Sequence, residues 1–239
     1  MEENIATLKR WVEESGNIVF FGGAGVSTES GIPDFRSVDG LYNQEYKYPP
    51  EEIISHSFFE RDPEEFYRFY RAKLVPDAQV RPNAAHLRLA ELEREGKLRA
   101  VITQNIDGLH QAAGSKRVIE LHGSVHWCYC AKCRKPYPES FINESTGVPR
   151  CDCGGIVRPN VVLYEEGLSE QDLTDAVNYI RTADVLIIGG TSLAVYPAAG
   201  LIRYFRGKHL VLVNMSATPY DDQAELIIRE KIGLVFSQI

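Results

Sequence analysis

The chain has 239 residues, of which 44% are hydrophobic and 25% are charged, a composition typical of a folded globular protein. Its net charge of -7 would repel a nucleic-acid backbone, so we expect no direct nucleic-acid binding. No apolar run reaches the roughly 18 residues that a membrane span needs. The N-terminus also lacks the profile of a signal peptide, so we expect a cytoplasmic protein with no membrane partner.

The predicted elements alternate between helices and short apolar strands. The first helix covers residues 2–15, where apolar side chains recur every three or four positions. Strands are then expected at 17–21, 99–103, 117–120, 184–188 and 209–213, and helices near 83–95, 170–182, 197–206 and 221–231. This alternation predicts an α/β fold with an open, mostly parallel sheet covered by helices on both faces. Ligands would bind at the carboxyl ends of its strands.

Two segments interrupt the alternation. Residues 45–82 are rich in aromatic and charged side chains and look helical, whereas residues 126–156 carry the cysteines and few strand-like runs. We interpret both as insertions that form a small second domain. The large domain would then comprise residues 1–44, 83–125 and 157–239.

The first candidate ligand site is the glycine-rich turn that follows the strand at 17–21. The Gly-Ala-Gly run at 23–25 would let the backbone approach a pyrophosphate, and the loop continues to an Asp-Phe-Arg run at 34–36. The dinucleotide-binding pattern is matched only in part, because Thr28 stands where its third glycine is expected. The alternative is an ordinary strand-to-helix turn, which needs glycine for steric reasons alone, followed by a salt-bridged surface loop.

Polar side chains also follow the next two predicted strands. Within the Thr-Gln-Asn-Ile-Asp-Gly-Leu-His run at 103–110, Asn105 and Asp107 could hold the carboxamide and ribose of a nicotinamide nucleotide. Asn and Asp favour capped turns as well, so a purely structural role is the alternative. His122 follows the strand at 117–120 and titrates near neutral pH, as a general base should. Most single histidines are not catalytic, and six compete for that role here.

The five cysteines cluster between Cys128 and Cys153, which predicts a metal site instead of a disulfide framework. The best set of four zinc ligands is Cys130, Cys133, Cys151 and Cys153, since a C-x-x-C pair forms a regular zinc knuckle. The second pair, C-x-C, is tighter than usual. Four thiolates leave the metal no open position, so its role should be structural. Cys128 is then left free.

Two further strand ends carry small and polar residues. A Gly-Gly-Thr-Ser run at 189–192 follows the most apolar strand and could contact phosphate or ribose. Asn214 ends the next strand, where dinucleotide-binding folds often use a carboxylate to bind the adenosine ribose. Both features also occur in ordinary strand-to-helix loops.

In this order, the motifs at 23–36, 103–110, 121–123 and 190–193, together with the four cysteines, closely resemble the sirtuin family, from about residue 16 to the C-terminus. The resemblance implies a Rossmann-like large domain and a small zinc-binding domain, with substrate in the cleft between them. It implies an NAD-dependent protein lysine deacetylase, which transfers the acetyl group of acetyl-lysine to ADP-ribose and releases nicotinamide and O-acetyl-ADP-ribose. Acetylated proteins or peptides would be its partners, NAD its co-substrate and one zinc ion a structural cofactor.

The same resemblance assigns roles to individual residues. His122 would be the general base and Asn105 the second catalytic residue. Residues similar to the NAD-binding residues of the family are Ala24, Thr28, Phe35, Arg36, Gln104, Asn105, Ile106, Asp107, Thr191, Ser192, Asn214 and Ile232. Val161 and Val162 would flank the acyl-lysine, in an extended segment that pairs with the peptide like an added strand.

The acyl group is predicted from Tyr67 and Tyr70. Desuccinylating relatives place a tyrosine and, three residues later, an arginine in the acyl pocket, whereas here Tyr67 is followed at that spacing by Tyr70. A succinyl carboxylate would lie unpaired in such a pocket, so we expect removal of acetyl or other uncharged acyl groups. Arg71 lies one position further, and a shifted alignment would restore the pair.

Two rival functions fit the same motifs. One is mono-ADP-ribosyl transfer, which would use the same NAD pocket but modify a protein side chain. The other is a non-catalytic module that binds NAD or acetyl-lysine.

Overall fold

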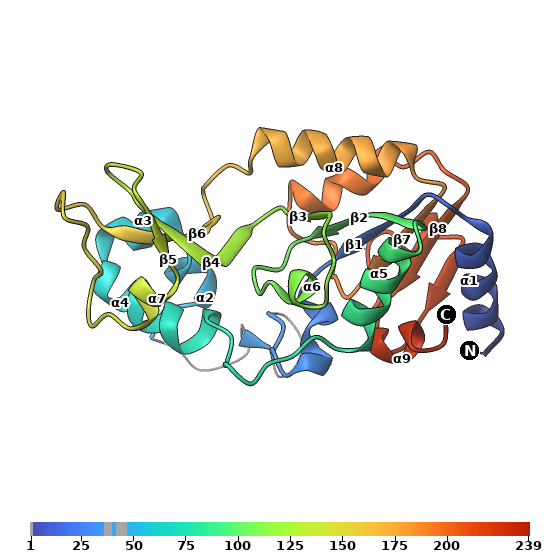
Figure 1. Cartoon of the computed structure of the whole chain (residues 1–239), viewed down its shortest axis with the longest axis horizontal. Coiled ribbons are helices and arrows are strands. Elements are labelled where there is room, and N and C mark those ends of the chain that lie inside the picture. Colours follow the sequence, from blue (N-terminus) through green and yellow to red (C-terminus); the bar gives the residue numbers. More distant parts are fainter. Residues whose placement is uncertain (1, 36–39, 42–46) are drawn as a thin grey trace.

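The computed structural model describes residues 2–35, 40–41 and 47–239. Its largest element is a six-stranded sheet with the strand order β3-β2-β1-β7-β8-β9 (Figure 1). The strands are β1 (Ile18–Gly22), β2 (Leu98–Thr103), β3 (Val118–Glu120), β7 (Val185–Gly189), β8 (His209–Val213) and β9 (Leu226–Ile228). Every neighbouring pair runs parallel, so all carboxyl ends lie at one edge of the sheet.

Both faces of this sheet are buried under helices. All five residues of β1 are buried, and because side chains alternate along a strand, Phe20 and Phe21 belong to cores on opposite faces. The core around Phe20 includes α1 (Glu2–Glu14), α5 (Ala84–Arg94) and α9 (Ile232–Phe236). The core around Phe21 includes α8 (Glu170–Thr182) and the 3₁₀ helix η5 (Ala198–Tyr204). The predicted α/β fold is thereby confirmed.

The predicted helix at 221–231 is wrong. That segment contains a single 3₁₀ turn, η6 (Asp221–Gln223), followed by β9, which extends the sheet beside β8. Leu226 and Ile228 pack into the core of one face, and Ile227 packs against the core of the other. This alternation suits a strand, and three such residues are too few to show a period in the sequence.

A second, smaller unit is built on an antiparallel sheet of order β5-β4-β6, with β4 (Gly123–Cys130), β5 (Pro136–Pro138) and β6 (Val157–Val161). Short helices surround it: α2 (Pro50–Ile53), α3 (His56–Arg61), α4 (Pro63–Phe69), the π-helix η4 (Tyr70–Leu74) and α7 (Ser140–Asn143). In Figure 1 this unit lies at the end of the molecule opposite both termini. Its sheet uses residues on both sides of the predicted boundaries at 125 and 157, and the domain limits stay a prediction.

Among the described residues, no helix combines the length and the apolar character that crossing a membrane requires.

Candidate active site

A cavity of about 550 Å³ lies at the carboxyl ends of β1, β2, β3 and β7. On one side it is bounded by the loops that follow these strands, including η1 (Ala24–Val26) and residues 104–107 just before α6 (Leu109–Ala112). On the other side it is bounded by residues 72–77 and 161–166, which connect to the small unit. Its size falls in the range of small-molecule and cofactor sites, and its place is the one where parallel sheets bind ligands.

Close backbone packing explains two glycines of the first turn. A Cβ atom at Gly23 would lie 2.7 Å from the Cβ of Thr191, and one at Gly25 would lie 2.9 Å from the backbone of Gly190. The amide of Gly25 donates to the carbonyl oxygen of Gly190 over 2.8 Å. The two glycines are therefore required for steric reasons. The close packing does not cover Ala24, which lies between them in the cavity wall, where a pyrophosphate could approach.

A buried polar cluster joins the β1 and β2 loops. The Ser27 hydroxyl donates to Asp107 Oδ2 over 2.6 Å and accepts a hydrogen bond from the Asn105 side-chain amide over 3.1 Å. Asp107 Oδ1 accepts from the backbone N–H of Leu109, which fixes the carboxylate. Ser27 is only 1% exposed and was missed by the sequence reasoning, although it ends the Gly-Ala-Gly-Val-Ser run. The cluster holds the side chain of Asn105 at the cavity.

His122 lies in the cavity wall, in the short connection between β3 and β4. Its Nδ1 lies 2.9 Å from the carbonyl oxygen of Gln104, which can only accept, so Nδ1 carries the proton and Nε2 is the basic atom. Burial lowers the pKa of His122 below its ordinary value, while the hydrogen bond to Gln104 acts in the opposite direction. The imidazole is therefore neutral near pH 7, the form that can accept a proton.

Most of the predicted site residues meet at this cavity. Those in its wall are Ala24, Phe35, Gln104, Asn105, Ile106, Asp107, His122, Val161, Val162, Thr191 and Ser192. Thr28, Asn214 and Ile232 are not in the wall. Thr28 is exposed and donates to the carbonyl of Gly25, the Asn214 side chain donates to the carbonyl of Ser216, and Ile232 packs in the core. Arg36 lies outside the described residues.

Tyr67 and Tyr70 do not line the cavity. Both are buried in the core of the small unit, at 0% and 1% exposure, and the Tyr67 hydroxyl donates to the carbonyl of Val157. Residues 72–77 do line it, among them Lys73, which the sequence reasoning missed. Tyr70 begins the π-helix that ends at Leu74, and Lys73 lies within it.

The four predicted metal ligands come together at the tip of the small sheet. Their sulfur atoms all lie within 4.8 Å of one another, with 3.5 Å between Cys130 and Cys153 and 3.6 Å between Cys133 and Cys151. Zinc bound tetrahedrally at about 2.3 Å from each sulfur needs sulfur atoms about 3.8 Å apart, so the set fits. Cys128 lies outside the cluster, buried in the core of the small unit.

The Sir2 family model matches residues 23–197. The chain belongs to the Sir2 family. Over its full length it is 59% identical to an NAD-dependent protein deacetylase of Clostridium perfringens, 99% of which is covered. It is also 45% identical over its full length to an NAD-dependent protein deacetylase of Staphylococcus aureus, again with 99% covered.

Solved structures of Sir2 proteins have the same fold. One, of Sir2 with a deacetylated p53 peptide and 3′-O-acetyl-ADP-ribose, matches with a TM-score of 0.90 and 43% identity, covering 98% of this chain and 96% of the other. Another, of Sir2 with a p53 peptide and NAD+, matches with a TM-score of 0.88 and 43% identity at the same coverage. The Rossmann-like sheet and its small companion unit are thus those of a Sir2 protein.

Proposed function

We propose that this Sir2 protein is an NAD-dependent protein lysine deacetylase, which transfers the acetyl group of acetyl-lysine to ADP-ribose and releases nicotinamide and O-acetyl-ADP-ribose. The observation that carries the proposal is the placing of His122, neutral and with Nε2 as its basic atom, in the same cavity as the Ser27–Asn105–Asp107 cluster. The names of the full-length relatives agree with it.

His122 would act as the general base. The Gln104 carbonyl fixes the tautomer, so Nε2 can take a proton from the ribose hydroxyl that attacks the acetyl carbon. The NAD co-substrate supplies the electrophilic ribose carbon and the acceptor for the acetyl group. Asn105, the second proposed catalytic residue, would orient the nicotinamide half with its side chain held by Ser27.

NAD would lie across the loops that follow β1, β2 and β7. The cavity volume, the close glycine packing and the polar cluster all fit a dinucleotide. We assign its contacts to the predicted residues in the wall: Ala24, Phe35, Gln104, Asn105, Ile106, Asp107, Thr191 and Ser192. Four cysteines would hold one zinc ion, which supplies rigidity to the tip of the small sheet and stands apart from the cavity.

The peptide would pair beside Val161 and Val162, which lie at the end of β6 and directly before residue 163. Strand β6 is at the edge of the small sheet, because its only ladder partner among the described residues is β4. An acetylated peptide can therefore add as a further strand beside it, with Val161 and Val162 next to the acyl-lysine.

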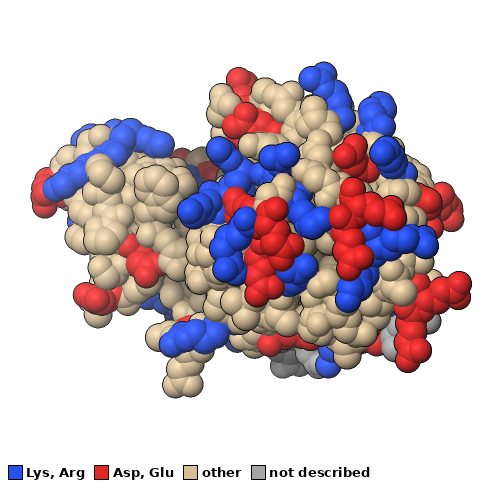
Figure 2. Space-filling model, turned by 45° about the vertical axis from the view of Figure 1, so that its right-hand side comes forward, with Lys and Arg blue, Asp and Glu red and all other residues tan. Residues whose placement is uncertain are grey.

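The surface charge favours protein substrates over nucleic acid. In the face shown in Figure 2, basic and acidic side chains are interspersed over the large unit. Together with the net charge of -7, this supports our inference that the protein binds no nucleic acid directly. We also infer a cytoplasmic location.

The test is turnover of an acetyl-lysine peptide with and without NAD, followed by mass spectrometry of all products. Deacetylation yields free lysine, nicotinamide and O-acetyl-ADP-ribose in equal amounts. An ADP-ribosylated peptide or protein would support the rival transferase instead. Binding of NAD or peptide without any product would support the binding module.

A further inference from the structure

Residues 163–166 form a tight turn directly after the proposed peptide-binding residues. The amide of Glu166 donates to the carbonyl of Leu163 over 3.1 Å, and all four residues of the turn lie in the cavity wall. Glu165 has a φ of 76°, a left-handed conformation that glycine adopts readily and other residues seldom do. A glutamate at this position therefore requires an explanation.

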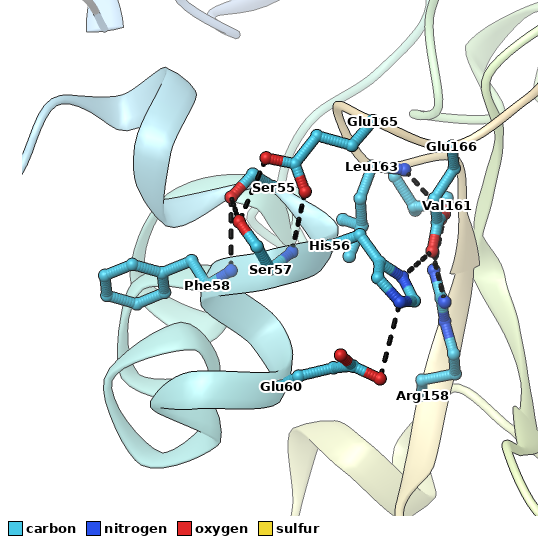
Figure 3. A network of polar contacts seen from close by, with 10 residues as sticks. All are labelled: Ser55, His56, Ser57, Phe58, Glu60, Arg158, Val161, Leu163, Glu165 and Glu166. Carbon is cyan, nitrogen blue, oxygen red and sulfur yellow. Dashed lines mark hydrogen bonds and ion pairs between the residues drawn. The ribbon is translucent and has the colours of Figure 1, made fainter.

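The side chain of Glu165 makes two hydrogen bonds to the start of helix α3. Its Oε2 accepts from the backbone N–H of Ser57 and its Oε1 accepts from the Ser57 hydroxyl, both over 2.9 Å (Figure 3). Backbone amides in the first turn of a helix have no partner within the helix, so a carboxylate is well placed there. Glu165 thus joins the turn to α3.

Glu166 fixes the other side of the same turn. Arg158 donates to both of its carboxylate oxygens, over 2.6 and 2.9 Å, and His56 Nδ1 lies 2.8 Å from Oε1. The backbone N–H of Leu163 also donates to this carboxylate. Burial alone would raise the pKa of Glu166, but these hydrogen bonds outweigh it and the pKa lies below its ordinary value. Figure 3 shows the Glu166 group and the Glu165 group on either side of His56.

Backbone hydrogen bonds connect the turn and α3 between these two groups. The amide of His56 donates to the carbonyl of Tyr164, and the amide of Tyr164 donates to the carbonyl of Ile54, both over 3.0 Å. The turn that follows the proposed peptide-binding residues is therefore held to residues 54–57 at several points. Glu165 supplies the outermost of them, since Ser57 is exposed whereas Arg158 is 7% exposed.

We propose that Glu165 is a positioning residue for the peptide substrate: by bonding to Ser57 it fixes the turn at 163–166 and so holds Val161 and Val162, directly before it, in the conformation with which an acetylated peptide pairs. The carboxylate is occupied by Ser57, so it acts through the backbone and not by touching the peptide. This inference rests on the proposed deacetylase function and goes beyond it by naming a determinant of peptide affinity.

The decisive variant is Glu165→Gly. Glycine adopts the positive φ without strain, and this gain offsets the loss of both hydrogen bonds to Ser57. The melting temperature should therefore not fall. KM for the acetylated peptide should rise about fivefold to tenfold, the equivalent of one or two hydrogen bonds, while kcat and KM for NAD stay unchanged. A peptide KM equal to that of the wild type would overturn the proposal. So would a parallel loss of stability, kcat and NAD binding, because that pattern indicates a merely structural role.

Three companion variants sharpen the result. Glu165→Gln keeps a side chain that can hydrogen-bond to Ser57 and should restore most of the peptide affinity. Ser57→Ala should have a smaller effect than Glu165→Gly, and the double variant should be no worse than Glu165→Gly alone; additive effects would contradict the pairing. Arg134→Gly is the matched control, since Arg134 also has a positive φ, of 62°, but is not in the cavity wall.

Direct binding separates this inference from the proposed function. Titration of a fluorescent acetyl-lysine peptide into each variant measures peptide affinity without turnover. If the wild type released no nicotinamide, the deacetylase proposal would fail. If the wild type turned over but Glu165→Gly bound peptide equally well, only the inference about Glu165 would fail.

Discussion

The backbone N–H of Val162 donates a hydrogen bond to the carbonyl oxygen of His122 over 2.9 Å. This bond continues the ladder between β4 and β6, in which Gly123 pairs with Val161. The proposed base and the proposed acyl-lysine contact are thus joined by a single backbone hydrogen bond. A shift of the peptide-binding edge would shift the base with it.

Replacing His122 with alanine should lower kcat/KM by about 10²- to 10⁴-fold, the usual contribution of a general base. The free energy of unfolding should change by only about 1 kcal/mol, because one hydrogen bond to Gln104 is lost. Initial rates of nicotinamide release and urea denaturation measure the two effects. His209→Ala, outside the cavity wall, should keep full activity. An active His122→Ala enzyme would exclude His122 as the base.

The pH dependence of kcat/KM should reflect the lowered pKa of His122. Burial lowers this pKa from its ordinary value of 6.5 despite the hydrogen bond to Gln104. A base acts in its neutral form, so activity is present above the lowered pKa and is lost as the pH falls through it. The midpoint of the acid limb should therefore lie below 6.5 in initial-rate measurements with saturating NAD. A midpoint above that value would contradict the assignment.

Ser27→Ala should weaken NAD binding and destabilise the fold. It removes the group that donates to Asp107 and accepts from Asn105, and leaving such buried groups unpaired costs about 1–3 kcal/mol. Measuring KM for NAD and the free energy of unfolding tests these two effects. Ser115→Ala is the matched control, because that hydroxyl is also buried but has no hydrogen-bond partner in the described part of the chain. Equal effects of the two substitutions would argue against a special role for Ser27.

Zinc should bind to one set of four cysteines. We expect one zinc ion per chain by atomic absorption in the wild type and in Cys128→Ala, and none in Cys151→Ala. A strong chelator should unfold the small unit first, seen as loss of hydrogen-exchange protection in β4 and β5 before the large sheet. Loss of zinc from Cys128→Ala would show that the ligand set is different.

Gly25→Ala should destabilise the protein by about 1–3 kcal/mol, since its Cβ would lie 2.9 Å from the rigid backbone of Gly190. NAD affinity should fall as well, because the β1 and β7 loops must separate. At Gly16 a Cβ would meet nothing within 4 Å, so Gly16→Ala should be neutral or slightly stabilising. Thermal unfolding of Gly25→Ala and Gly16→Ala, with and without NAD, measures both the stability and the NAD affinity of each variant.

Strands β1 and β7 could be predicted because all their residues are buried and they therefore read as continuous apolar runs, such as 185–188. The cysteine cluster could be predicted because its ligands come in two close pairs. In contrast, β9 was missed because a run of three apolar residues fits both the helical and the strand periodicity. Only the pairing with β8 decides its conformation.

Contacts between distant segments were not accessible to sequence reasoning. Ser27 and Asp107 are 80 residues apart, and nothing in either motif indicates that one serves the other. The acyl-pocket roles of Tyr67 and Tyr70 stay a prediction: both side chains lie in the core of the small unit, and Lys73, within the π-helix at 70–74, lies in the cavity wall.

The strand pair β4–β6 has the cysteine cluster near one end and the cavity at the other, as the pairings of Cys130 with Val157 and of Gly123 with Val161 show. Cys133 and Cys153 are exposed, so oxidants in the surroundings reach two of the four sulfur atoms directly. Oxidation there would remove the cluster that holds one end of these two strands, whose other end carries the proposed peptide-binding residue Val161. The enzyme would then lose turnover under oxidative stress while its large sheet stayed folded.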